Sequence, residues 1–143
     1  MGNLSLLKSI ALDYIMEFIK LTRRALPLTG YAYQDASNVE MCILGDFLMS
    51  SVGYDVSSFK EWGLTDIWKN DETNGNVTAL ERHDNYIFLK DLFSEEDVPT
   101  VLKMTRDQFG KILTDWEEKV CKLKPKEVII KYENDQFVIE TKN

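Results

Sequence analysis

The stretch TRDQFGKILTDWEEKVCKLKPKEVIIKYENDQFVI, residues 105–139, contains a helix signal followed by two strand signals. Thr105 and Gln108 have the spacing of a capping box, so a helix is predicted to begin after Thr105. Apolar residues then recur at steps of three and four, which predicts one buried helical face formed by Phe109, Ile112, Leu113, Trp116, Val120 and Leu123. Pro125 ends this helix because proline cannot continue it.

The segment after Pro125 predicts a C-terminal β-hairpin. Its strands are expected at 128–132 and 137–139, with a tight turn at Asn134 and Asp135. A two-residue turn fixes the register of the two strands. It pairs Tyr132 with Phe137 and Ile130 with Ile139 on one face, and it leaves Lys131 and Glu140 on the other face.

The remaining segments predict an α+β fold. Amphipathic helices are expected at 4–25 and 37–52, the second starting with a capping box formed by Ser37 and Glu40. One or two short helices are expected within 53–68, a loop at 70–79, and strands at 86–89 and 101–104. We expect a small antiparallel sheet, including the hairpin, on which the N-terminal helices and the late helix pack. The length of 143 residues and the lack of a linker predict one domain over residues 1–143.

The charge of the chain is acidic and uneven. The formal net charge is −7; residues 1–118 hold 11 Lys and Arg against 20 Asp and Glu, and residues 119–143 hold 6 against 4. This balance disfavours direct binding to nucleic acid, because phosphate contacts require Lys and Arg on the bound face. The acidic residues either attract a basic protein partner or serve only to keep the protein soluble.

Neither export nor membrane insertion is expected. The apolar N-terminal segment is interrupted by Lys8, Asp13, Glu17 and Lys20, which argues against a signal peptide and a membrane span. Cys42 and Cys121 lie inside apolar helical patterns, so buried free thiols are expected in place of a disulfide bond. These features favour a cytoplasmic protein.

The sequence offers little material for catalysis. His83, next to Asp84, is the only histidine and could form an oriented base, although a solvated loop histidine is the favoured explanation. The chain has no metal-ligand spacing of Cys and His, and no glycine-rich turn opens a helix. We therefore expect a non-enzyme without a metal or cofactor.

Binding through charge and shape is the remaining possibility. Residues 66–97 hold nine acidic and three basic residues. Trp62 and Trp68 are each either an aromatic anchor or part of the core, and Trp68 is the candidate anchor among the binding residues. The candidate binding residues are Asp66, Trp68, Asp71, Glu72, Asp84, Glu95, Glu96 and Asp97. Asp35 and Asp55 are alternative acidic positions, which helix capping explains equally well.

The second half of the chain resembles a known family. The words YIFLKDLFSEEDVPTVLKM (86–104) and those of 105–143, preceded by MCILGDFL (41–48) and FKEW (59–62), are similar to immunity proteins of bacterial contact-dependent growth inhibition systems. The resemblance implies a cytoplasmic bacterial protein that binds and neutralises the C-terminal toxin domain of one cognate effector. Such toxins are often nucleases, frequently ones that cleave tRNA. An acidic face that imitates the phosphates of RNA would suit a basic nuclease cleft.

Two other classes of function remain open. An adaptor or structural protein would pair with another chain, or with a second copy of itself, through the apolar stripe of the first helix or the hairpin edge. An enzyme would require His83, and its replacement by alanine would then abolish activity.

Overall fold

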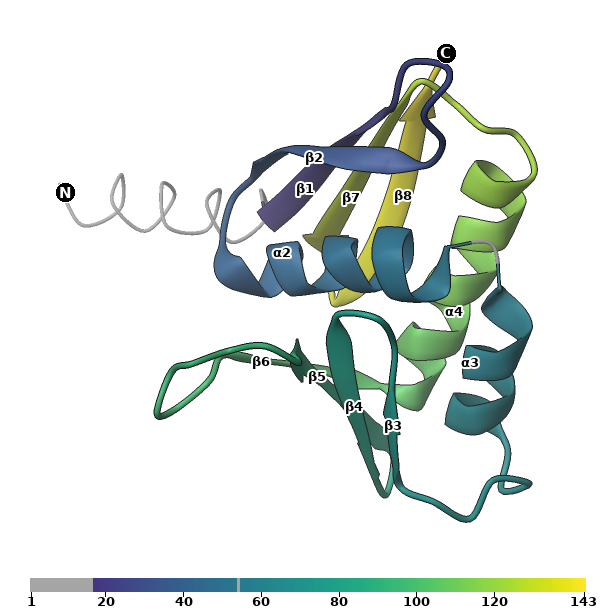
Figure 1. Ribbon diagram of the computed structural model, residues 1–143. Helices are drawn as coiled ribbons and strands as arrows, with labels where there is room; N and C mark the ends of the chain where they lie inside the picture. The colour runs from purple at the N-terminus through teal and green to yellow at the C-terminus, as the bar shows by residue number, and fades with distance from the viewer. Residues whose placement is uncertain (1–16, 54) are drawn as a thin grey trace, which may run out of the picture.

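The computed structural model describes residues 17–53 and 55–143, in which two four-stranded antiparallel sheets lie one above the other (Figure 1). The first sheet has the order β2-β1-β7-β8 and comprises β1 (Glu17–Arg23), β2 (Tyr31–Ala36), β7 (Glu127–Glu133) and β8 (Gln136–Lys142). The second has the order β3-β4-β5-β6 and comprises β3 (Glu72–Asn74), β4 (Thr78–His83), β5 (Tyr86–Asp91) and β6 (Val101–Thr105). The predicted α+β class is confirmed, with two small sheets in place of one.

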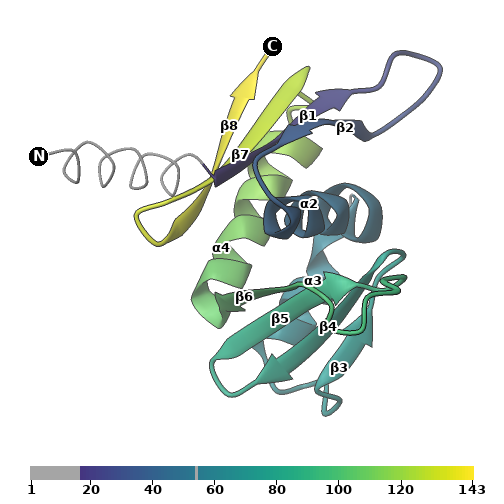
Figure 2. The same ribbon diagram turned by 90° about the vertical axis from the view of Figure 1, so that its left-hand side faces the viewer.

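The helices join the two sheets. Helix α2 (Val39–Asp46) continues into the π-helical turn η1 (Phe47–Val52) and lies between the sheets (Figure 2). Helix α4 (Arg106–Trp116) continues into a second π-helical turn, η2 (Glu117–Cys121), and contacts β8 of one sheet and β5 and β6 of the other. Helix α3 (Val56–Leu64) packs on α4. The inner faces of both sheets and these helices share one apolar core, whose fully buried side chains include Trp116, Phe47 and Phe109.

The predicted helix over 4–25 is wrong for its C-terminal part, because Glu17–Arg23 forms strand β1. Ile19 and Leu21 are fully buried while their neighbours are not, which is the two-residue alternation of a half-buried strand. Strand β1 pairs with β2 on one side and β7 on the other, so long-range pairing decides its conformation. Residues 4–16 of the prediction lie outside the described residues.

The predicted helix over 37–52 is confirmed, but its cap is shifted by one residue. The Asn38 side chain accepts a hydrogen bond from the Met41 amide at 2.9 Å, in place of the expected Ser37. Ser37 is engaged elsewhere, since its hydroxyl accepts from the Phe18 amide at 2.8 Å. The helix also approaches sheet β2-β1-β7-β8 closely: a Cβ atom at Gly45 would lie 2.3 Å from Ile19 Cδ1. A side chain at position 45 would therefore require the buried Ile19 side chain to move.

The predicted loop over 70–79 is partly wrong. Its residues Glu72–Asn74 form the edge strand β3, which pairs with β4. Polar residues suffice there because the outer edge of β3 faces solvent and the strand is only three residues long. Strand β4 buries Thr78, Leu80 and Arg82 on one face. Two of these three buried residues are polar, so the sequence does not show the alternation of apolar and polar residues that predicts a strand.

The predictions for the C-terminal third are confirmed. Thr105 and Gln108 form the reciprocal capping box of α4, and the predicted face of the helix is buried as far as Val120, whereas Leu123 is exposed. The hairpin has the predicted register, with Tyr132 opposite Phe137 and Ile130 opposite Ile139. Asn134 and Asp135 both have positive φ angles, as the favoured two-residue turn requires. Lys131 and Glu140 form an ion pair of 3.0 Å on the opposite face.

Candidate functional site

The segment between α3 and β3, residues 65–71, wraps around the side chain of Arg82. This arginine projects from β4 and is 6% exposed. Its guanidinium donates hydrogen bonds to the backbone carbonyl oxygens of four residues, which are Trp62, Thr65, Trp68 (2.8 Å) and Asn70. Because Arg82 carries a charge, these bonds are stronger than those between neutral groups. The segment is therefore held by its backbone, although its side chains have little to bury.

Two further contacts complete the setting of Arg82. The Asp71 carboxylate accepts hydrogen bonds from Nε at 3.2 Å and Nη2 at 3.1 Å, which neutralises the buried charge. The guanidinium also lies over the Trp62 ring, with Cζ 5.4 Å from the ring centroid. Trp62 is 4% exposed, and its indole N–H donates to the Asn70 carbonyl at 2.9 Å. Of the two roles considered for Trp62, the structure shows the core role.

Fixing the backbone in this way turns apolar side chains outward. Ile67 is 70% exposed and Trp68 50%, and the last residue of α3, Leu64, next to this segment, is 41% exposed. Exposed apolar patches commonly mark interaction sites. Trp68 is thus placed as an anchor residue would be, and Ile67 and Leu64, which sequence reasoning missed, accompany it.

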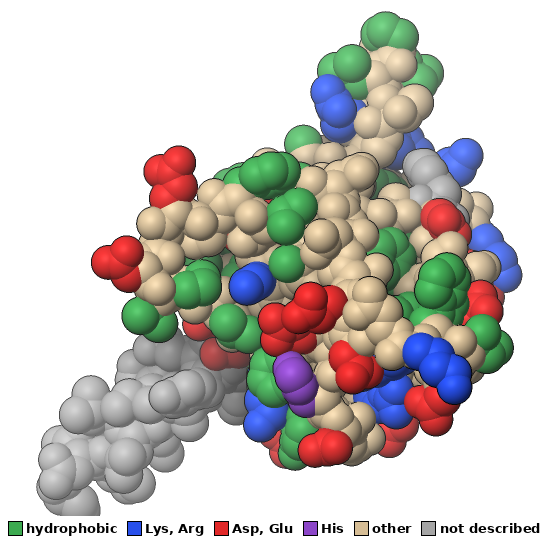
Figure 3. Space-filling view, turned by 60° about the horizontal axis from the view of Figure 1, so that its bottom comes forward, with side chains coloured by type: hydrophobic (Ala, Val, Ile, Leu, Met, Phe, Trp, Pro, Cys, Tyr) green, Lys and Arg blue, Asp and Glu red, His purple; other side chains and the backbone are tan. Residues whose placement is uncertain are grey.

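Four of the candidate acidic residues gather around this segment. Asp66, Asp71 and Asp84 line one open polar hollow of about 370 Å³ together with Arg82, His83 and Arg106. Glu72 follows Asp71 as the first residue of β3 and is exposed. Figure 3 shows this end of the molecule, where acidic side chains surround the histidine. We call the side chains of Leu64, Asp66, Ile67, Trp68, Asp71, Glu72 and Asp84 the acidic-aromatic surface.

Arg106, one of the residues that line the hollow, is only loosely held by its partners. Arg106 Nη2 lies 3.6 Å from the Asp66 carboxylate, whose side chain is 94% exposed, so this ion pair is long and well solvated. Among the described residues, Arg106 Nε is the buried side-chain nitrogen or oxygen without a hydrogen-bond partner. The Asp66–Arg106 contact therefore restrains Asp66 weakly.

Glu95, Glu96 and Asp97 do not belong to the acidic-aromatic surface. They lie in the β5–β6 loop, at the opposite end of β5 from Asp84 in the β4–β5 turn. A six-residue strand separates the two ends by about 17–20 Å. Figure 1 shows the β5–β6 loop extending away from the segment that precedes β3. The eight candidates thus form two groups and not one continuous surface, because the length of β5 lies between them.

The β5–β6 loop has its own small hollow. Asp46 of α2, Asp91 and Glu96 contribute carboxylates to its lining, and its volume is about 110 Å³. Partial burial raises the pKa of Asp46 above its ordinary value of 3.8, and the nearby Asp91 carboxylate raises this pKa further. The ionised form of Asp46 is therefore held less favourably in the folded protein than in the unfolded chain.

Replacing Asp46 with asparagine is expected to stabilise the protein near neutral pH by less than about 1 kcal/mol. Because the pKa of Asp46 is raised in the folded protein, ionised Asp46 lowers the free energy of unfolding by its full amount at pH values above that pKa. This loss disappears as the pH falls below 3.8, where Asp46 is protonated in both states. Urea unfolding of both proteins across this range should show a gain at neutral pH that vanishes in acid. A difference that is independent of pH would contradict this account. Asp91→Asn should give part of the same gain.

Three further candidates from the sequence, His83, Asp55 and Asp35, lie outside the acidic-aromatic surface as defined. His83 ends β4 with its side chain 62% exposed, and its Nε2 lies 3.1 Å from the Glu81 carboxylate. Asp55 occupies the N-cap position of α3, but its carboxylate accepts from the Ser58 hydroxyl and makes no capping bond to the backbone. Asp35 lies in β2, away from any helix end, so the capping explanation is wrong for it.

Both thiols are free, as predicted, and are partly buried where full burial was expected. Burial raises the pKa of Cys42 and of Cys121, and nearby carboxylates raise both further. Cys121 Sγ also donates to the Gly53 carbonyl at 3.3 Å. Neither thiol is therefore activated as a nucleophile.

Within residues 17–53 and 55–143, His, Cys, Asp and Glu side chains form no group of three or more suited to a metal ion. No helix in this part of the chain combines the length and apolar character needed to cross a membrane. Comparisons with protein families, with curated proteins and with solved structures gave no match. The acidic-aromatic surface is therefore interpreted from its own chemistry.

Proposed function

We propose that this chain is an immunity protein, which binds and neutralises the C-terminal toxin domain of a cognate contact-dependent growth inhibition effector. The observation that supports this proposal most is the acidic-aromatic surface, in which Arg82 fixes a protruding backbone beneath the exposed Ile67 and Trp68 side chains. Binding sites with a tryptophan at the centre and polar residues at the rim are typical of tight protein–protein interfaces. In this proposal the protein acts by binding and has no catalytic role.

The charge of the surface indicates a basic partner. Four carboxylates, those of Asp66, Asp71, Glu72 and Asp84, lie around the anchor, and one of them is committed to Arg82. A nuclease must attract RNA or DNA with a basic cleft, and this carboxylate rim would compete for the same cleft. The toxin is thus proposed to be a nuclease, with tRNA as one possible substrate, and the protein to act in the bacterial cytoplasm.

The pre-formed loop has an energetic consequence. Ordering a flexible segment on binding costs part of the interaction energy, whereas a segment already held in place loses little freedom. Because the hydrogen bonds to Arg82 fix residues 65–71 in the free protein, the acidic-aromatic surface should change little in conformation when it meets its partner.

The direct test is calorimetric titration with the C-terminal domain encoded by the reading frame immediately upstream. Tight one-to-one binding that weakens with salt would support both the function and the acidic mechanism. Tight binding without salt dependence would keep the function and move the interface away from these carboxylates. Absence of binding to that domain would contradict the proposal.

Charge reversal tests which acidic group the partner meets. The double variant Asp66→Lys/Glu72→Lys is expected to slow association with the toxin domain by about tenfold or more at low salt, because rim charges act mainly on the association rate. Asp71 is left unchanged because it bonds to Arg82. The matched control is Glu95→Lys/Glu96→Lys, which makes the same change in net charge at the β5–β6 loop. The association rates are measured by stopped-flow or surface-plasmon methods. Equal slowing in both double variants would contradict a contact between the partner and the acidic-aromatic surface.

A further inference from the structure

A large groove lies at the end of the molecule opposite to the acidic-aromatic surface. Its volume is about 830 Å³, and it is lined by the end of β1, the β1–β2 loop, the turn before β7 and the ends of β7 and β8. Figures 1 and 2 place this end beside the C-terminus, with the β4–β5 turn at the other end of the fold. The two features therefore do not overlap.

The groove is basic, although the protein is acidic. Five of the 17 Lys and Arg residues line it, but only one of the 24 Asp and Glu residues does so among those described. The five cationic residues are Arg23, Arg24, Lys124, Lys126 and Lys142. The single acidic residue, Glu127, forms an ion pair with Lys20 at 3.5 Å, which offsets its charge. An anion entering the groove would thus meet a net positive lining.

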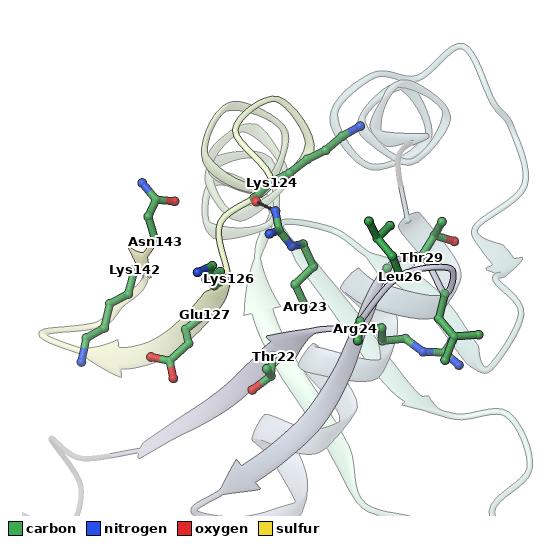
Figure 4. A pocket seen from close by; sticks show the side chains of 13 residues that line it. Thr22, Arg23, Arg24, Leu26, Thr29, Lys124, Lys126, Glu127, Lys142 and Asn143 are labelled. Atoms are coloured by element: carbon green, nitrogen blue, oxygen red, sulfur yellow. Dashed lines mark hydrogen bonds between the residues drawn. The ribbon is translucent and has the colours of Figure 1, made fainter.

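Hydrogen bonds between distant segments hold the lining in place. The Arg23 amide donates to the Lys126 carbonyl at 2.8 Å, and the Arg23 guanidinium donates to the Lys124 carbonyl (Figure 4). The Tyr31 hydroxyl donates to the Pro125 carbonyl at 2.5 Å. Across the β1–β2 loop, the Arg24 amide donates to the Gly30 carbonyl at 3.0 Å. The groove is therefore a built feature of the fold and not a chance arrangement of surface lysines.

One side of the groove is apolar. Leu26 is 90% exposed and Leu28 is 52% exposed in the β1–β2 loop, which stands opposite the ends of β7 and β8 (Figure 4). Exposed leucines in a groove lined by cationic residues suit a ligand that combines carboxylates with an apolar side chain.

We propose that this groove binds an acidic polypeptide segment that carries an apolar residue. Two observations favour a polypeptide over a nucleic acid. None of the described residues that line the groove carries an aromatic ring, so nucleobases would find no surface for stacking. A long polyanion would also extend over the acidic remainder of the protein, whereas a short acidic segment can stay within the groove. The volume is close to the upper end of the range of ligand sites, which suits several residues of a chain.

The test uses fluorescence anisotropy with three probes. These are a short labelled peptide of alternating acidic residues and leucine, the same peptide with every acid replaced by its amide, and an oligothymidylate of similar length. The acidic peptide is expected to bind one-to-one and more weakly at high salt. Its affinity should fall by at least about tenfold in Lys126→Glu/Lys142→Glu, because both lysines are exposed groove residues. The amide peptide should bind no more than weakly.

The matched control is Lys60→Glu/Lys103→Glu, which changes the net charge equally outside the groove. Equal losses in both double variants, no binding of the acidic peptide, or tighter binding of oligothymidylate would each overturn the proposal. Lys126→Gln/Lys142→Gln repeats the comparison without introducing new acids, so that a folding defect in one variant leaves the test intact. Because the groove and the acidic-aromatic surface lie at opposite ends, failure of this proposal is independent of toxin binding.

Discussion

Replacing Arg82 with methionine is expected to lower the free energy of unfolding by about 3 kcal/mol or more. The substitution keeps most of the apolar stem but removes the guanidinium's hydrogen bonds to the carbonyls of Trp62, Thr65, Trp68 and Asn70. The Asn70 carbonyl keeps its bond from the Trp62 indole, whereas the other three lose their donor from Arg82. Each buried carbonyl left without a donor costs about 1–3 kcal/mol unless water reaches it. The loss should appear in urea unfolding, together with faster hydrogen exchange of the amides of residues 65–71.

Two variants separate the role of Arg82 from a general effect of losing an arginine. Arg106→Met alters a second arginine of the same hollow, whose one ion pair is long and solvated, so its effect should stay below about 1 kcal/mol. Arg82→Lys keeps the charge but lacks the planar array of donors, so its effect should lie between those of the other two. Equal destabilisation by Arg82→Met and Arg106→Met would contradict the loop-holding role.

Replacing Trp68 with alanine is expected to weaken binding of the cognate toxin domain by about 2–4 kcal/mol, which corresponds to roughly 30- to 1,000-fold in Kd. Half of the Trp68 side chain is exposed in the free protein, and its backbone carbonyl, which alanine retains, makes the bond to Arg82. Stability should therefore change by less than about 1 kcal/mol. Calorimetric titration gives the first quantity and urea unfolding gives the second.

The control for Trp68 is a second exposed aromatic residue in the other acidic loop. Phe93 is 68% exposed in the β5–β6 loop, and Phe93→Ala should leave toxin affinity almost unchanged. If Phe93→Ala weakens binding and Trp68→Ala does not, the partner meets the β5–β6 loop, and the acidic-aromatic surface is not the interface. Such an outcome would leave the immunity proposal in place with its site moved.

The C-terminal third could be predicted because local signals there agree with one another. The capping box of Thr105 and Gln108, the helical spacing after it and the turn residues Asn134 and Asp135 all require only neighbouring residues. Strand β1 could not be predicted in the same way. Its sequence EFIKLTR suits both a helical and a strand period, and its pairing with β7, more than 100 residues away, decides between them.

The sequence predicted the kinds of residue at the candidate site, but not the role of Arg82 or which acidic residues lie together. The acidic and aromatic composition of residues 66–72 is visible in the sequence, and the structure places these residues together. The role of Arg82 is hidden, because its partners are mostly backbone carbonyls, which every residue carries. Glu95–Asp97 were predicted to join the same surface because they lie close to Asp84 in the sequence. The prediction was wrong because strand β5 lies between them and carries the chain to the other end of the sheet.

Arg82 recognises the loop through main-chain oxygens, and this has a consequence for how the protein can evolve. The hydrogen bonds of the guanidinium to this loop's backbone do not depend on the side chains of Asp66, Ile67 and Lys69, so other residues can replace them while the loop keeps its path. A duplicated gene could thus change its binding specificity by substitutions at a few outward positions of the loop, while the fold stays the same. Under the proposed immunity function, a rigid frame with exchangeable surface positions would let new binding specificities arise without a new fold.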